Sequence, residues 1–264
     1  MIALMMNPAA PRPLASLTAA SAALLVLLLL WGLVEPRLLD GVPVWAKPVK
    51  FALSFVVLFA TLALVEARLS PAWRDGRVMR LTVAVMGVAM IAEMAYIIAQ
   101  AALGEASHFN FSTPYNAIMY GTVMAFGAIL LVLGVAVTGV VVWRDRAADL
   151  GPALRQAIAY GFVLTFVLTM ITAMTLGGMD GHHVGLPGPD AATIPLFGWS
   201  AAVGDLRPSH FLALHAMQVL PLAGLWIDRR GLRADVMPLL AFAYVLLTMA
   251  VFAQALMGMP LIRL

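Results

Sequence analysis

Long runs of apolar residues, separated by short polar stretches, make up most of this chain. Seven of these runs are long enough to cross a bilayer, which takes about 20 residues in a helix. We expect the membrane-spanning helices near residues 16–35, 49–68, 79–103, 115–143, 153–176, 209–227 and 237–258. The pattern predicts an all-α integral membrane protein. Its seven-helix bundle forms a single domain, 16–264, after a short disordered tail, 1–15.

The composition of the chain agrees with this pattern and narrows the class of protein. Of the 264 residues, 63% are hydrophobic and only 11% are charged, whereas soluble globular domains carry about 25% charged residues. The chain has no cysteine, which excludes disulfides, iron–sulfur clusters and thiolate metal sites. The net charge of +3 comes mainly from arginines in short loops. The predicted partner is therefore the lipid bilayer and not nucleic acid.

Basic residues are distributed unevenly between the two sides of the predicted bundle. Eleven lie in the N-terminal tail and in the second, fourth and sixth loops: Arg12, Arg68, Arg74, Arg77, Arg80, Arg144, Arg146, Arg155, Arg229, Arg230 and Arg233. Five lie elsewhere: Arg37, Lys47, Lys50, Arg207 and Arg263. Because short loops rich in Lys and Arg stay in the cytoplasm, we expect a cytoplasmic N-terminus and a periplasmic or extracellular C-terminus. The first, third and fifth loops then face outward.

Two of the apolar runs carry polar side chains well inside the predicted membrane. Glu93, Tyr96 and Gln100 are spaced so that they share one face of the third helix. Glu93 lies about 15 Å below the outer end of that helix, at a rise of about 1.5 Å per residue. Gln218 in the sixth helix comes out at a similar depth to Glu93, and His215 lies within one or two turns of both. Because a polar group in lipid needs a partner or water, these residues predict a polar pocket that opens outward.

Four histidines in or near the outer loops are candidate ligands of Zn, Fe or haem: His108, His183, His210 and His215. Imidazole is the commonest protein ligand of transition metals, and His182 is the alternative to its neighbour. His210 and His215 point about 140° apart on a regular helix, so they are not expected to bind one ion. Asp205 and Glu93 are the candidate acid–base residues. The alternative is that these histidines only donate hydrogen bonds to loop backbone.

A second group of residues predicts binding of an anionic lipid or a small anion. Lys47 and Lys50 are the only lysines of the chain, and with Trp45 and Arg207 they lie at the outer boundary of the membrane. Lys and Arg there bind phosphate or carboxylate groups. The alternative is that the two lysines extend to the membrane surface beside an interfacial tryptophan.

The leading hypothesis from these residues is a metal-dependent membrane enzyme, a hydrolase or oxidoreductase that acts on a small or lipid-like anionic substrate. Tyr96, Gln100 and Gln218 would contribute to substrate binding. The chain contains no zinc-protease, serine-hydrolase or nucleotide-binding motif. The alternatives are a proton-coupled carrier or lipid-binding protein that uses the same pocket, and a structural membrane subunit whose polar residues join helices.

Three segments, WAKPVKF, EASHFN and GDLRPSHFLALH, resemble segments of bacterial polytopic inner-membrane proteins. The resemblance covers most of the chain, from Trp45 to Gln218. It implies a location in the bacterial inner (plasma) membrane. With the orientation expected from the arginines, the pocket then faces the periplasm. No activity follows from it.

Overall fold

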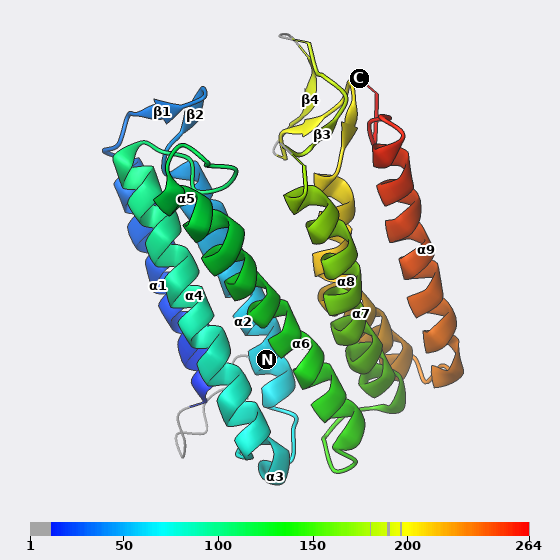
Figure 1. Cartoon of the computed structure of the whole chain (residues 1–264). Coiled ribbons are helices and arrows are strands. Elements are labelled where there is room, and N and C mark those ends of the chain that lie inside the picture. The colour runs from blue at the N-terminus through cyan, green and yellow to red at the C-terminus, as the bar shows by residue number, and fades with distance from the viewer. Residues whose placement is uncertain (1–11, 180, 189–190, 196, 264) are drawn as a thin grey trace. The chain divides into compact units, whose positions relative to one another are not determined.

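The computed structural model describes residues 12–179, 181–188, 191–195 and 197–263. The chain is 71% helical, and seven of its helices are long and apolar enough to cross a membrane. Each of them overlaps one of the seven expected spans, so the prediction of seven apolar helices is confirmed. The chain divides into two compact units, residues 1–134 and 135–264, which are described here in turn (Figure 1).

The first unit is built from long helices joined by short loops. Its elements are α1 (Pro13–Gly32), β1 (Leu38–Leu39), β2 (Val42–Pro43), α2 (Ala46–Glu66), α3 (Pro71–Arg74), α4 (Arg77–Leu103), α5 (Pro114–Ile118), η2 (Met119–Met124) and the first half of α6 (Ala125–Arg144). Helix α1 packs along α2, and α2 packs against α4. Proline at the first helical position starts α1 at Pro13, so residues 13–15, which we expected in the tail, are helical.

The first loop of this unit contains a β-hairpin that the all-α prediction did not include. Strands β1 and β2 pair antiparallel around Asp40 and Gly41. Both of these residues have positive φ angles, 50° and 77°, as a two-residue hairpin turn of type I′ requires. The Asp-Gly dipeptide is the sequence signal for this turn.

The fourth apolar span is not a uniform α-helix. Between α5 and α6 the segment Met119–Met124 forms one turn of π-helix, η2, a feature that is often found at functional sites. Below it, Gly127 and Gly134 of α6 both face α4. A Cβ atom would lie 2.6 Å from a Glu93 oxygen at the first glycine, and 2.4 Å from the Met86 sulfur at the second. Glycine therefore allows α6 to lie close to α4 and leaves room for the Glu93 carboxyl group.

The second unit contains the second half of α6, α7 (Pro152–Gly177), β3 (His183–Val184), β4 (Thr193–Ile194), β5 (Trp199–Ser200), β6 (Gly204–Asp205), α8 (Arg207–Arg229), η3 (Ala234–Val236) and α9 (Met237–Leu256). Helices α7 and α8 form its closest pair. A Cβ atom at Gly161 would lie 2.7 Å from the Ala216 carbonyl oxygen, so only glycine permits this approach of the two backbones.

Asp228 at the end of α8 fixes the start of α7. Its two carboxylate oxygens accept hydrogen bonds from the backbone amides of Ala153 (3.0 Å) and Leu154 (2.8 Å). These amides belong to the first turn of a helix, where they have no partner within the helix itself. The carboxylate thus caps α7 from a neighbouring helix end.

The described residues of the loop from α7 to α8 include short strands, which were also not expected. Strand β3 pairs antiparallel with β6, so that His183 lies opposite Asp205, and β4 pairs with β5.

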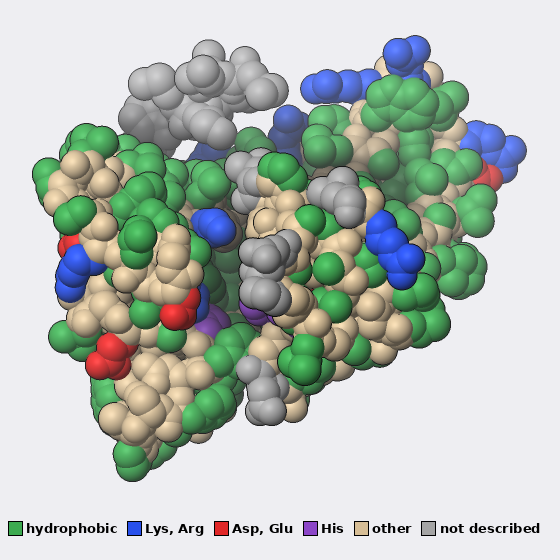
Figure 2. Space-filling model, turned by 90° about the horizontal axis from the view of Figure 1, so that it is seen from above, with side chains coloured by type: hydrophobic (Ala, Val, Ile, Leu, Met, Phe, Trp, Pro, Cys, Tyr) green, Lys and Arg blue, Asp and Glu red, His purple; other side chains and the backbone are tan. Residues whose placement is uncertain are grey.

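The long helices expose many large apolar side chains. Examples are Leu81, Val88 and Ile91 in α4 and Leu239 and Leu247 in α9. Figure 2 shows hydrophobic side chains over much of the visible flanks, with scattered charged ones among them. Such surfaces are costly in water and favourable in lipid, and they fit a multi-pass membrane protein.

Candidate functional sites

Helix α4 of the first unit carries three buried polar side chains on one face, Glu93, Tyr96 and Gln100. The Gln100 amide nitrogen donates to the Tyr96 hydroxyl oxygen (2.9 Å) and to the Asn116 side-chain oxygen (2.6 Å). The Tyr96 hydroxyl donates to the same Asn116 oxygen (3.3 Å). Two of the predicted substrate-binding residues, Tyr96 and Gln100, therefore belong to one hydrogen-bonded group.

Asn116 connects this group to the loop between α4 and α5. Its amide nitrogen donates to Glu105 (3.2 Å) and to the Ser112 hydroxyl oxygen (3.3 Å). Glu105 is exposed, whereas Asn116 and Gln100 are buried. We call Glu105, Asn116, Gln100, Tyr96 and Glu93 the polar column. It leads from the surface of the loop to Glu93, about one helical turn beyond Tyr96.

Glu93 ends the polar column without a hydrogen-bond partner for one of its oxygens. The side chain is only 5% exposed, and its Oε1 atom has no partner among the described residues. The Oε1 atom of Gln100 also has no hydrogen-bond partner among the described residues. Buried polar atoms in proteins are almost always paired, by protein groups, water or a ligand. The column therefore offers two acceptors to a donor that the described residues do not supply.

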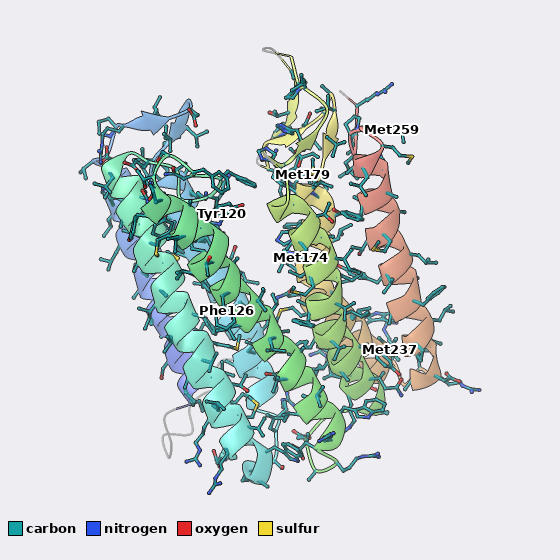
Figure 3. The ribbon with its side chains drawn as sticks, in the orientation of Figure 1. Tyr120, Phe126, Met174, Met179, Met237 and Met259 are labelled. Carbon is teal, nitrogen blue, oxygen red and sulfur yellow. The ribbon has the colours of Figure 1, made fainter. Side chains whose placement is uncertain are left out.

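His108, a predicted metal ligand, lies in the same loop and is packed between aromatic rings. Its ring centroid is 5.4 Å from that of Phe51 and 5.5 Å from that of Tyr120, which lies near this end of the fourth span (Figure 3). Its Nδ1 atom is 3.1 Å from the Ser107 hydroxyl oxygen. Burial, and then the positive charge of Lys47, lowers the pKa of His108 to about 3. The ring is therefore neutral near pH 7, as a metal ligand must be, and only its Nε2 atom is left for an ion.

The two predicted anion-binding lysines differ in their surroundings. Lys47 is half-buried at the start of α2 and close enough to His108 for its charge to act on that ring. Lys50 is exposed. The anion site that combines these lysines with Arg207 stays a prediction.

The loop of the second unit brings together His182, His183 and Asp205. One ligand atom of each lies within 4.8 Å of the others, and His183 Nε2 is 3.8 Å from an Asp205 oxygen. Burial lowers the pKa of His182 to about 4 and also lowers the pKa of His183. Both imidazoles are therefore neutral near pH 7 and have lone pairs to offer. Met174 and Met179 lie near this end of α7 (Figure 3).

The carboxylate of Asp205 is already held by protein donors. Arg207 donates to it from its side-chain NH2 group (2.6 Å), from Nε (3.0 Å) and from its backbone amide (3.0 Å). The Ser200 amide adds a fourth donor (2.9 Å). Burial opposes ionisation of Asp205, but these hydrogen bonds outweigh it and the pKa of the carboxyl lies below its usual value. Asp205 and Arg207, predicted as a catalytic acid and an anion-binding residue, thus bind each other.

His210 and His215 of α8 have separate surroundings, consistent with their angular separation. The Nδ1 atom of His210 is 3.1 Å from the Thr172 hydroxyl oxygen of α7. The Nδ1 atom of His215 is 2.7 Å from the carbonyl oxygen of Phe211, and the two rings stack at 3.9 Å. Each histidine retains one ring nitrogen for a ligand. Gln218 lies half-buried one turn further along α8.

The structure thus groups the predicted residues within each unit. The first unit joins Tyr96 and Gln100 in one hydrogen-bonded group beside Glu93, and the second joins His183 to Asp205. Sets that draw on both units, such as His108 with His210, stay predictions. The residues that sequence reasoning left out of its site are Glu105, Ser112, Asn116, Thr172 and Ser200. Asn116 could have been identified from the sequence, because it is a polar residue in the first turn of an apolar span.

Seven apolar helices, together with buried polar side chains inside them, are what a multi-pass membrane protein requires. Comparison of the chain with protein-family models, with curated proteins and with solved structures found no match. The function therefore has to be inferred from the two sites themselves.

Proposed function

We propose that the chain is a multi-pass protein of a bacterial inner membrane that binds a small hydrogen-bond-donating solute in the polar column and carries it in exchange for a proton. In this proposal the end of the column at Glu105 faces the periplasm, as the distribution of arginines favours. The observation that carries the proposal is the buried Glu93 oxygen without a partner among the described residues, in the space left by Gly127.

The hydrogen bonds of the column suggest how such a solute would be held. Asn116 and Tyr96 fix the position of the Gln100 amide, so that its free oxygen and the Glu93 carboxylate accept from the solute. An amine or hydroxyl compound supplies the required donors. A carboxyl group inside a membrane can hold a proton when no solute is bound, and groups of this kind form the coupling sites of proton-driven carriers.

Binding at Glu93 can be tested by thermal stability, because a ligand that binds only the folded state raises the melting temperature. The full chain in lipid nanodiscs is measured with ammonium, ethanolamine and glycerol, which all donate hydrogen bonds. We expect at least one of these probes to raise the melting temperature of the wild type and of Glu35→Gln, a surface acid outside the column. Glu93→Gln should remove the shift. A shift that survives in Glu93→Gln, or a wild type that none of the probes stabilises, refutes the proposal.

A second candidate function rests on the short distances between His182, His183 and Asp205. A transition metal, Zn or Fe, would support a hydrolase or oxidoreductase in the loop of the second unit. The two neutral imidazoles fit such an ion. Asp205 fits less well, because Arg207 and Ser200 occupy its oxygens. The ion would therefore be held by the histidines, with Asp205 orienting His183.

Elemental analysis and an optical spectrum of one preparation test this second candidate. Stoichiometric zinc or iron that is lost in His183→Ala supports it, and a Soret band supports haem, with His215 as the candidate ligand. A colourless protein without a transition metal rules out both. The carrier proposal does not depend on this result, because its residues lie in the other unit.

A further inference from the structure

The second unit contains an apolar groove that neither candidate function uses. It has a volume of about 550 Å³ and lies between the end of α6, the first half of α7 and the start of α9. Its lining includes Val140 and Trp143 of α6, Tyr160 and Val163 of α7, and Phe242 of α9. All three helices belong to spans that are apolar enough to cross a membrane. Volumes of this size are typical of sites for small organic ligands.

The position of the groove along the helices matches one half of a bilayer. It begins at Trp143, next to the last residue of α6, and at Pro238 in the first turn of α9. Along α9 it extends to Val245, about 10 Å further at 1.5 Å per residue. On α7 its far end is Leu164, about 18 Å from the start of that helix. The hydrocarbon layer of one leaflet is about 15 Å thick, so along α9 the groove takes up about two thirds of the depth of one leaflet.

The loops at the open end of the groove are positively charged. Segments 144–155 and 228–236 contain six arginines and four aspartates. Asp228 caps α7, Asp235 pairs with Arg233, and Asp145 accepts from the backbone amide of Ala147, so three of the four acids are bound within the protein. Arg144 and Arg146 are exposed and directly follow the groove residue Trp143. An anion placed at the end of the groove therefore meets positive charge at the depth of a lipid headgroup.

We propose that this groove binds one anionic phospholipid, with an acyl chain between α6, α7 and α9 and the phosphate group at Arg144 and Arg146. The apolar lining favours a hydrocarbon chain, and the exposed arginines select a negative headgroup. The site lies at the end of the unit opposite the loop that contains His183, and it is distinct from the anion site expected at Lys47 and Lys50.

The proposal can be tested by counting bound lipids with native mass spectrometry. The full chain, freed of lipid in detergent, is titrated with phosphatidylglycerol and with phosphatidylcholine of the same acyl chains. We expect one tightly bound phosphatidylglycerol per chain and weaker phosphatidylcholine. Arg144→Gln with Arg146→Gln should weaken phosphatidylglycerol about fivefold for each arginine, in line with about 1 kcal/mol per basic residue at a membrane surface, and should leave phosphatidylcholine unchanged.

Filling the groove tests the position of the acyl chain. Val163 is 36% exposed and lines the groove, so Val163→Trp places a large ring where the chain would lie. Leu246→Trp is the matched control, because this residue of α9 is exposed and lies outside the lining. We expect Val163→Trp to weaken both lipids at least tenfold and Leu246→Trp to have no effect.

Three results would overturn the proposal. The first is equal binding of the two lipids by the wild type. The second is an equal effect of the two tryptophan variants. The third is thermal stabilisation by inorganic phosphate alone that matches the effect of phosphatidylglycerol, which would show an anion site without an acyl chain. If Val163→Trp does not fold, the comparison of the two lipids and the arginine variants still test whether the groove binds an anionic phospholipid.

Discussion

Acidification should destabilise the loop of the first unit through His108. This ring is packed between Phe51 and Tyr120 and lies near the charge of Lys47, and its pKa is lowered to about 3. In the unfolded chain a histidine takes up a proton near its usual pKa of about 6.5. Between these two values the unfolded state binds more protons than the folded state. Stability must therefore fall as the pH is lowered from about 6.5 toward 3.

The size of this effect follows from the two pKa values. Each pH unit in the interval costs about 1.4 kcal/mol, so His108 alone lowers the free energy of unfolding by about 2 kcal/mol between neutral pH and pH 5. For a chain of this size that corresponds to a decrease of about 4–8 °C in the melting temperature. His182 and His183, whose pKa values are also lowered, add to the total in the same direction. The contribution of His108 is therefore measured as a difference between variants.

The assay is the melting temperature in nanodiscs at about pH 7.5 and about pH 5. His108→Phe keeps an aromatic ring between Phe51 and Tyr120 but cannot be protonated, so its decrease on acidification should be smaller than that of the wild type by the amount given above. Phe51→Leu is the control, because it weakens the packing and leaves the titrating ring in place. It should melt lower at both pH values and keep the full decrease. An equally large decrease in His108→Phe and in the wild type would refute this reasoning.

Three further substitutions probe other contacts. Asp205→Asn leaves the Arg207 guanidinium without its anionic partner. We expect the free energy of unfolding to fall by about 1–3 kcal/mol, less than for a fully buried pair because Arg207 is partly exposed. The loop before α8 should then be cleaved faster by proteases. Asp228→Ala removes the cap of α7 and should cost about 1–2 kcal/mol, whereas Asp228→Asn should restore much of it; chemical denaturation compares the two. Gly127→Ala should abolish the solute-dependent shift in melting temperature, because its Cβ atom would lie 2.6 Å from the Glu93 oxygen. Gly121→Ala is the control and should keep the shift, because its Cβ atom would have no neighbour within 4 Å. An intact shift in Gly127→Ala would show that this space is not used.

The long helices could be predicted from the sequence because one physical rule decides them. A run of about 20 apolar residues in lipid must pair its backbone within the segment, so it forms a helix whatever its detailed packing. The short strands do not follow from such a rule. Strand β3 pairs with β6 only because His183 and Asp205, 22 positions apart, meet in the folded loop. By contrast, the hairpin at Asp40 and Gly41 depends on local backbone angles, and its dipeptide was a usable signal.

Side chains on one helix could be placed together from spacing, but their partners on other elements could not. The positions of Tyr96 and Gln100 on one face follow from the helical repeat. That Asn116 bonds to both depends on how α5 is placed against α4, which no local pattern specifies. The same limit applies to Asp205, which sequence reasoning offered as a catalytic acid. Its bonds with Arg207 and Ser200 depend on the fold of the loop.

Burial of an acid in this chain is therefore not sufficient evidence for a binding site. Three buried acids, Asp205, Glu66 and Glu93, differ in what surrounds their oxygens. Asp205 is buried, yet its oxygens accept hydrogen bonds from four donor groups of Arg207 and Ser200, so it stabilises a loop. Glu66 is buried at the last turn of α2, where it accepts from the backbone amide of Leu14 in the first turn of α1, so it acts as a helix cap. Glu93 lies in the middle of a span, and a glycine on the facing helix leaves room for its unpaired oxygen. One oxygen of Glu66 also has no partner among the described residues, but Glu66 lies at a helix end, whereas Glu93 lies in mid-span beside the hydrogen-bonded group of Tyr96 and Gln100. For that reason the search for a ligand should begin at Glu93.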